Sequence, residues 1–227
     1  MEVSKLKNSG RESLTVFISN ESPSGQTARA WSAPVLWLTG LSGAGKSTLA
    51  EGASALLNSR GVRSIVIDGD ALRGGLSSDL GFSAEDRAEN VRRASEVAAL
   101  CSRAGITTFV ALVSPFEGDR AKARSTIGEQ FHEIFVSADY ATCRARDTKG
   151  LYKLAEQGKI RDFTGLDSPY EAPLAPQMVL ETAAYEATVC IEQLASFALR
   201  NCLHLSATAS TPASFEAPEK RGRSSAV

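Results

Sequence analysis

The chain carries one glycine-rich motif, Gly40-Leu41-Ser42-Gly43-Ala44-Gly45-Lys46-Ser47, that restricts its possible folds more than any other segment. Glycines at this spacing let backbone N–H groups close around phosphate oxygens, and the N-terminus of a following helix adds positive partial charge. An apolar run at residues 35–39 precedes the motif, and a helical pattern at residues 46–58 follows it. A chance glycine-rich turn rarely has both flanks, so the motif predicts a loop that binds a nucleoside triphosphate.

Within this phosphate loop, the residue types indicate separate tasks. The Lys46 ammonium is expected to reach the β- and γ-phosphates, and the Ser47 hydroxyl is expected to ligate Mg²⁺. The residues expected to surround ATP and its magnesium ion are Gly40, Ser42, Gly43, Ala44, Gly45, Lys46, Ser47 and Thr48.

Apolar and β-branched runs alternate with helical patterns along the chain. The expected strands are residues 35–39, 64–67, 106–113 and 133–137, with a weaker one at 178–180. Apolar residues repeat at helical spacing from Val91 to Ala104, and Ser83 is a capping signal for the start of that helix. This alternation predicts an α/β fold in which helices cover both faces of a parallel sheet. Ligands of such sheets bind beyond the carboxyl ends of the strands.

Charge and composition exclude several classes of partner. The 227 residues include 25 Lys/Arg and 26 Asp/Glu, so no overall charge draws the chain to nucleic acid or to an anionic membrane. No apolar run reaches the ~18 residues that span a membrane, and residues 1–10 lack an apolar run of signal-peptide length. The four cysteines show no Cys-x-x-Cys spacing. We therefore expect a cytoplasmic protein with reduced thiols, which binds neither nucleic acid polymers nor membranes.

Composition also divides the chain into three parts. Residues 8–33 are rich in Ser, Gly, Thr and Asn around one apolar stretch at 14–18, which is a candidate for a lone strand. Residues 1–33 are therefore expected to be a partly ordered extension. Residues 206–227 lack apolar periodicity and are predicted to be a disordered tail. Residues 34–205 are expected to form one domain, which is an ordinary domain size.

The second expected strand ends in Asp68-Gly69-Asp70. Carboxylates at this end of a strand lie across from the phosphate loop, where they suit metal–water coordination or orientation of an attacking hydroxyl. A helix N-cap and a surface ion pair are the structural alternative for the same residues. A switch-type nucleotide hydrolase would instead carry guanine-reading or switch elements at such positions.

Several segments, in this order, resemble the adenylylsulfate kinase (APS kinase) family. They are residues 38–48, 68–70, 79–83, 85–93, 114–116, 119–120, 146–147, 149–153 and 163–171. Many kinases share the phosphate loop, whereas Lys149-Gly150-Leu151-Tyr152-Lys153 and Phe163-Thr164-Gly165-Leu166-Asp167 together are far more specific. The resemblance covers roughly residues 35–182.

The resemblance implies the P-loop kinase fold with a lid at about residues 147–171. The implied reaction is transfer of the γ-phosphoryl group of ATP to the 3′-hydroxyl of adenosine 5′-phosphosulfate (APS), giving PAPS in sulfate assimilation. It further implies that ATP and Mg²⁺ are required, that ATP and APS are the small-molecule partners, and that the chain forms a homodimer.

Matched position by position, the resemblance also implies roles for single residues. Lys46, Asp70 and Ser114 form the catalytic set, with Asp70 orienting or deprotonating the 3′-hydroxyl. Ser114 matches a serine that is phosphorylated in some members, and it is not a nucleophile. The implied acceptor site comprises Asp70, Arg73, Phe82, Arg87, Asn90, Val113, Ser114, Lys149 and Phe163.

Within that site, Phe82 and Phe163 would sandwich the acceptor adenine, and Arg87 and Asn90 would hold its phosphosulfate end. Lys149 belongs to the lid, and Arg146 would lie against the ATP adenine. From residue types alone, core packing explains Phe82 equally well, and a solvated helix face explains Arg87. Ser114 is equally typical of a turn.

Three positions depart from the family pattern: Ala71 replaces an asparagine, Gly74 a polar residue, and Glu117 a basic residue. A lost amide donor and an added negative charge would weaken binding of a dianionic nucleotide. Two alternatives therefore stay open. One is a kinase of the same fold that acts on another hydroxyl acceptor, such as a different nucleotide or a natural product. The other is a nucleotide-binding regulator, which the intact phosphate loop and Asp70 disfavour.

Overall fold

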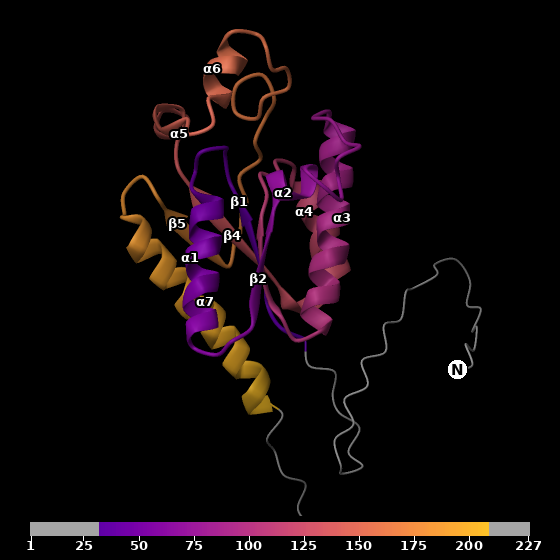
Figure 1. Ribbon diagram of the computed structural model, residues 1–227, viewed down its shortest axis with the longest axis vertical. Helices are drawn as coiled ribbons and strands as arrows, with labels where there is room; N and C mark the ends of the chain where they lie inside the picture. Colours follow the sequence, from indigo (N-terminus) through magenta and orange to yellow (C-terminus); the bar gives the residue numbers. More distant parts are fainter. Residues whose placement is uncertain (1–31, 209–227) are drawn as a thin grey trace, which may run out of the picture.

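Five parallel strands form one sheet at the centre of residues 32–208, the part of the chain that the computed structural model describes (Figure 1). They are β1 (Val35–Thr39), β2 (Ser64–Asp68), β3 (Thr107–Ala111), β4 (Phe131–Ser137) and β5 (Met178–Glu181). The order across the sheet is β2-β3-β1-β4-β5, and every neighbouring pair is parallel. The strand that leads into the phosphate loop thus lies in the middle of the sheet.

Helices cover both faces of the sheet, as the sequence predicts. On one face lie α1 (Lys46–Ser59) and α7 (Ala187–Thr208), which pack against each other, and on the other lie α3 (Ala84–Arg103) and α4 (Glu117–Ile127) (Figure 1). The shorter helices are α2 (Gly69–Arg73), α5 (Tyr140–Arg146) and α6 (Leu151–Glu156), with a 3₁₀ turn η1 (Gly128–Gln130) before β4. In Figure 1, α5 and α6 stand above one edge of the sheet.

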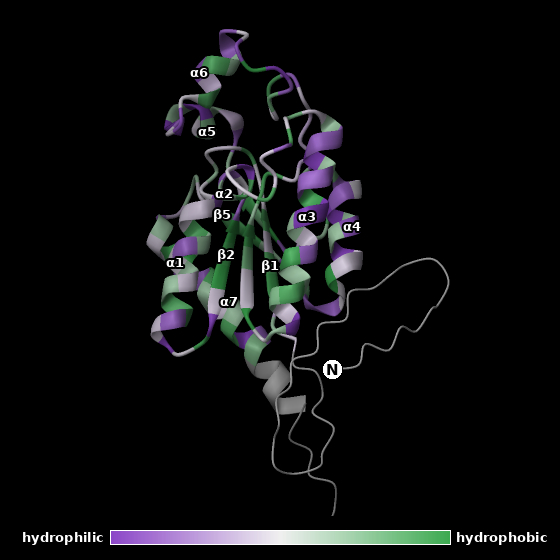
Figure 2. Cartoon of the chain, turned by 45° about the vertical axis from the view of Figure 1, so that its right-hand side comes forward, coloured by the Kyte–Doolittle hydropathy of each residue, from purple (hydrophilic) through white to green (hydrophobic). Residues whose placement is uncertain are grey.

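The two helical layers are held by alternate side chains of the same strand. Leu36 and Leu38 of β1 are fully buried in the core with α1 and α7, whereas Val35 and Trp37 are fully buried in the core with α3 and α4. Successive strand residues point to opposite faces, so a strand that is covered twice must be apolar throughout. Figure 2 shows the hydrophobic residues along the strands and the hydrophilic residues on the outer sides of the helices.

Most of the predicted element boundaries agree with the structure. The 35–39 strand has the predicted bounds, and Ser83 is the N-cap of α3, where its Oγ accepts a hydrogen bond of 3.1 Å from the Asp86 N–H. The predicted 106–113 strand is too long, because β3 ends at Ala111 and the chain then turns away toward Ser114. Helix α7 continues to Thr208, past the domain boundary predicted at residue 205.

Two further expectations fall on the ends of the chain. The strand predicted at 14–18 and the tail at 209–227 lie outside the described residues. Between residues 32 and 208, no helix has both the length and the apolar character needed to cross a membrane.

Candidate active site

The phosphate loop connects β1 to α1 and has a backbone that only glycine fits well. Gly40, Gly43 and Gly45 have φ angles of 151°, 77° and 104°, in a region that side chains disfavour. A Cβ atom on Gly40 would collide with the carbonyl oxygen of Val136. The predicted loop therefore has the open backbone that a phosphate cradle needs.

Lys46 is buried at the start of α1, and its ammonium group turns back onto the loop. Its Nζ donates hydrogen bonds of 2.9 Å to the Gly40 carbonyl and 2.7 Å to the Leu41 carbonyl. Burial lowers the pKa of Lys46 to about 8, because desolvation disfavours the charged form. Phosphate oxygens in the loop would give this cation the negative partner that carbonyl groups only partly replace.

A hydroxyl and a carboxylate meet beside the loop. Ser47 Oγ donates a 2.5 Å hydrogen bond to Asp68 Oδ2 at the end of β2. Hard oxygen ligands of this kind suit Mg²⁺, which usually takes one or two protein oxygens together with substrate phosphates and water. The described residues contain no group of three or more His, Cys, Asp or Glu that would hold a metal alone. The pair fits a magnesium ion that arrives with a nucleotide, and Asp68 is a candidate ligand that the sequence analysis did not list beside Ser47.

Asp68 and Asp70 also adopt the structural alternative that the sequence left open. Asp68 is the N-cap of α2, with Oδ1 accepting from the backbone N–H groups of Asp70 and Ala71. Asp70 forms an exposed ion pair with Lys149 of the segment predicted as a lid. Asp70 raises the pKa of Lys149 by accepting this hydrogen bond. The structure thus brings the predicted base and the predicted lid cation together.

Three of the predicted acceptor residues, Arg73, Phe82 and Arg87, form a cluster. The Arg73 guanidinium lies 4.3 Å from the centre of the Phe82 ring and that of Arg87 lies 5.8 Å away. Arg73 also donates to the backbone carbonyl of Gly81. The Phe82 side chain is 56% exposed, so the core-packing alternative is wrong. An exposed aromatic ring next to two cations suits an aromatic, anionic ligand.

Arg87 connects this cluster to the segment predicted as a lid. Its Nε donates to the Phe82 carbonyl at 2.9 Å, and its Nη2 donates to the Asp162 carbonyl at 2.8 Å. The neighbouring Arg92 and Arg93 pair instead with Glu89 on the helix surface. Of the three arginines on this part of α3, Arg87 therefore faces the candidate site.

Phe163 and Asn90 are both buried. Phe163 is 7% exposed and packs edge-on against Tyr152, in surroundings that differ from those of Phe82. Arg87 lies between Phe82 and Phe163 in the contact network, because it is close to the Phe82 ring and bonds to the carbonyl of Asp162, the neighbour of Phe163. The stacking of Phe82 and Phe163 on an adenine stays a prediction. The Asn90 amide oxygen has no hydrogen-bond partner among the described residues. Buried amides are normally paired, so Asn90 is available to a ligand.

Ser114 is a buried turn residue just past β3. Its φ angle is 37°, its Oγ accepts a 3.1 Å hydrogen bond from the Trp37 indole N–H, and its carbonyl accepts from Arg120. The neighbouring Val113 carbonyl accepts a 2.7 Å hydrogen bond from Thr39 Oγ1. These contacts favour the turn role for Ser114, and its catalytic role stays a prediction.

Arg146 lies against the phosphate loop at the end of α5. Its Nη1 donates to the Gly43 carbonyl at 3.4 Å and to Thr182 Oγ1 at 3.2 Å. Thr182 Oγ1 in turn donates to the Ala44 carbonyl at 2.8 Å. Thr182 follows the edge strand β5 and carries no motif of its own, so the sequence analysis did not identify it as a neighbour of the loop.

The segment predicted as a lid is attached to the body of the protein at its far end. The Tyr170 hydroxyl lies 3.0 Å from Thr39 Oγ1, one residue before the phosphate loop. The Glu171 N–H donates to the Pro115 carbonyl, and the Glu171 carbonyl accepts from Arg120. The end of the predicted lid at Glu171 and the turn at Ser114 are therefore held by the same arginine.

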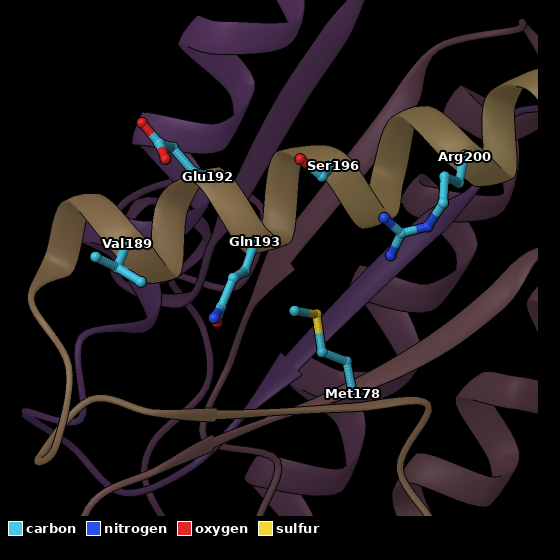
Figure 3. A pocket seen from close by; sticks show the side chains of 6 residues that line it. All are labelled: Met178, Val189, Glu192, Gln193, Ser196 and Arg200. Carbon is cyan, nitrogen blue, oxygen red and sulfur yellow. The ribbon is translucent and has the colours of Figure 1, made fainter.

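A separate open groove of about 350 Å³ lies between β5 and α7 (Figure 3). Met178 lines it from the strand, and Val189, Glu192, Gln193, Ser196 and Arg200 line it from the helix. None of the predicted site residues belongs to this groove.

Comparison with known proteins identifies the family of the chain. The family model described as adenylylsulphate kinase matches residues 32–181. The adenylyl-sulfate kinase of Bacillus licheniformis is 50% identical over 164 residues, which are 72% of this chain and 83% of that protein. The adenylyl-sulfate kinase of Paraburkholderia xenovorans is 52% identical over 148 residues, which are 65% of this chain and 83% of that protein.

Among solved structures, the Mycobacterium tuberculosis APS kinase CysC in complex with AMPPNP and APS superimposes with a TM-score of 0.71 at 40% identity. The match covers 74% of this chain and 98% of that chain. The motifs, the fold and the family match over most of the chain agree, and the chain belongs to the adenylylsulphate kinase family.

Proposed function

We propose that this chain is an adenylyl-sulfate kinase, which transfers the γ-phosphoryl group of ATP to the 3′-hydroxyl of APS and releases PAPS. The observation that carries the proposal is the position of Asp70 in the first turn of α2, just beyond the end of β2. It lies two residues beyond Asp68, which contacts Ser47 of the phosphate loop, and it is paired with Lys149 of the lid. A carboxylate in this place can meet an acceptor hydroxyl that approaches the γ-phosphate.

On the donor side, the phosphate loop would hold the ATP phosphates through its backbone N–H groups. Lys46 would exchange its bonds to the Gly40 and Leu41 carbonyls for bonds to phosphate oxygens. Ser47 and Asp68 would hold Mg²⁺, whose charge offsets that of the phosphates. Arg146, next to Gly43 and Thr182, would lie on the adenine side of this loop.

On the acceptor side, Phe82 would provide the exposed stacking face for adenine, with Arg73 and Arg87 as the cations for the anionic end. Asn90 would supply a buried amide to the same ligand. Asp70 would accept or orient the proton of the 3′-hydroxyl once Lys149 moves from it toward the transferring phosphoryl group. Catalysis of this kind depends on positioning and charge neutralisation.

The proposal is tested by incubating the protein with Mg·ATP and APS and separating the nucleotides by ion-exchange chromatography. PAPS that forms in step with ADP supports it. Phosphorylation of another hydroxyl compound in place of APS would favour the different-acceptor alternative, which the exposed Ala71, Gly74 and Glu117 keep relevant. ATP binding without transfer to any acceptor would favour the regulator.

We further propose that the protein requires Mg²⁺, serves sulfate assimilation in the cytoplasm and forms a homodimer. The Ser47–Asp68 pair supports the magnesium requirement, and the family resemblance supports sulfate assimilation and the homodimer. The four cysteines without paired spacing support the cytoplasmic location. Chelation of Mg²⁺ with EDTA should abolish PAPS formation, and readdition should restore it. Light scattering coupled to size-exclusion chromatography should give about twice the chain mass of 24.0 kDa.

A further inference from the structure

Tyr152 of α6 contacts both halves of the candidate site. Its hydroxyl donates a 2.8 Å hydrogen bond to the carbonyl of Ser42, in the middle of the phosphate loop. Its ring packs edge-on against Phe163, with ring centres 4.9 Å apart and planes at 78°. The side chain is 2% exposed, and burial raises the pKa of Tyr152, so the hydroxyl keeps its proton and acts as a donor.

The two contacts join residues assigned to different nucleotides. Ser42 belongs to the loop that would hold the ATP phosphates, and Phe163 belongs to the proposed acceptor site. A shift of the Ser42 backbone on phosphate binding would displace the bonded hydroxyl. Closely packed rings move together, so the displacement would reach Phe163.

The ring cluster includes a natural comparison. Tyr140 packs against Tyr152 with ring centres 5.4 Å apart, yet its hydroxyl makes no hydrogen bond within the described residues. Both tyrosines therefore contribute a ring to this aromatic cluster. Of the two, only Tyr152 also forms a hydrogen bond with the phosphate loop.

We propose that Tyr152 is a positioning residue that couples the ATP site to the APS site, so that each nucleotide raises the affinity for the other. The proposal rests on the proposed function. The Ser42–Tyr152 hydrogen bond connects the ATP site to α6. The Tyr152–Phe163 ring contact passes the displacement of Tyr152 on to the acceptor site. Tyr152 itself touches no reacting atom in this scheme.

Tyr152→Phe tests the hydrogen bond to Ser42, because it removes the hydroxyl and keeps the ring. The Kd of APS is measured by calorimetry with and without saturating Mg·AMPPNP, and the ratio of the two values is the coupling factor. We expect the variant to lose about fivefold of this factor, the worth of one ordinary hydrogen bond. Tyr140→Phe is the matched control and should keep the wild-type factor.

Phe163→Leu tests the other contact and also guards against a folding defect in the first variant. We expect it to lower the coupling factor as well, and the double variant with Tyr152→Phe should lose little more than the larger single effect. Near-ultraviolet circular dichroism of each variant checks the packing.

The outcomes separate the two proposals. An unchanged coupling factor in Tyr152→Phe, or no coupling in a wild-type protein that binds and phosphorylates APS, overturns the role of Tyr152 and leaves the proposed function intact. A wild-type protein that neither binds nor phosphorylates APS overturns the proposed function, and the coupling with it.

Discussion

Lys149 of the predicted lid and Asp70 in the first turn of α2 form an ion pair across the candidate acceptor site. The group proposed to receive the acceptor proton is thus paired with the Lys149 cation. An incoming 3′-hydroxyl has to take the place of Lys149 on the carboxylate. Both side chains are largely exposed, so their attraction is modest and the exchange is easy.

Asp70→Asn should therefore separate chemistry from binding. The amide keeps the size of the side chain but cannot accept the proton, so we expect kcat for PAPS formation to fall by about 10²- to 10⁴-fold, the usual worth of a general base. The Kd of Mg·AMPPNP should change less than about threefold, because no loop contact is lost; this is well below one tenfold step of binding energy. Initial rates and calorimetry measure the two effects.

Glu156→Gln provides the control for Asp70→Asn. It removes another exposed carboxylate that forms an ion pair, here with Arg144, from the end of α6. Its kcat should stay near the wild-type value. A kcat for Asp70→Asn close to that of Glu156→Gln would remove Asp70 from the catalytic set.

Lys46 predicts a pH dependence of nucleotide binding. Burial lowers its pKa to about 8 in the free protein, and phosphate oxygens would raise it in the complex. Below pH 8 the ammonium is charged in both states, so its titration leaves the affinity unchanged. Above pH 8 binding must take up a proton, so the affinity for Mg·AMPPNP should fall by up to about tenfold per pH unit.

Calorimetry from pH 7.5 to 9.5, in two buffers of different ionisation enthalpy, measures both the affinity and the proton uptake. Lys46→Arg should bind without uptake, because a guanidinium stays charged throughout this range. Lys46→Ala should abolish transfer. A wild-type affinity that is constant to pH 9.5 would place the pKa of Lys46 well above 8.

The central strand and the phosphate loop could be predicted because their sequence constraints are local. A strand that is buried on both faces must be apolar throughout, as β1 is, and the loop glycines take φ angles that other residues disfavour. The end of β3 was predicted too late, because Leu112 is buried like the strand before it although the ladder ends at Ala111. Burial alone does not mark where strand pairing stops.

The helices after β3 were not assigned from the sequence. Helix α4 starts after Phe116, which makes no side-chain cap, and α6 has six residues. Contacts between distant segments were also out of reach: Tyr152 meets Ser42 across 110 positions of the chain. Such pairs depend on how α6 packs against the phosphate loop, which no local pattern records.

Ser83 allows a direct test of a local signal that was read correctly. Its Oγ caps the first turn of α3, so Ser83→Ala should lower the free energy of unfolding by about 1 kcal/mol. Urea unfolding followed by circular dichroism measures the change. Ser125→Ala is the control, because that hydroxyl bonds to the Ala121 carbonyl within its own helix and alanine is the better helix former. Equal losses in both variants would mean that the cap contributes nothing specific.

Among the side chains around the Ser114 turn, we expect Arg120 to contribute most to the free energy of unfolding. It is 2% exposed, and its guanidinium bonds to Glu133 at 2.7 Å, to the Ser114 carbonyl at 2.9 Å and to the Glu171 carbonyl at 2.8 Å. Arg120→Met would leave a nearly buried carboxylate without its main partner, which typically costs about 3–5 kcal/mol. Urea unfolding should show this loss.

The double variant Arg120→Met/Glu133→Leu separates the ion pair from the two carbonyl bonds. Removing both charges should recover part of the stability, because the remaining side chains pack without an uncompensated charge. In both variants the Ser114 and Glu171 carbonyls lack their donor. The KM for APS should therefore be higher than in the wild-type protein, while the KM for ATP should change little. Arg92→Ala, which breaks an exposed pair with Glu89, should cost less than about 1 kcal/mol. If Arg120→Met lost no more stability than Arg92→Ala, the buried Arg120 network would not hold the Ser114 turn and the segment at Glu171 together.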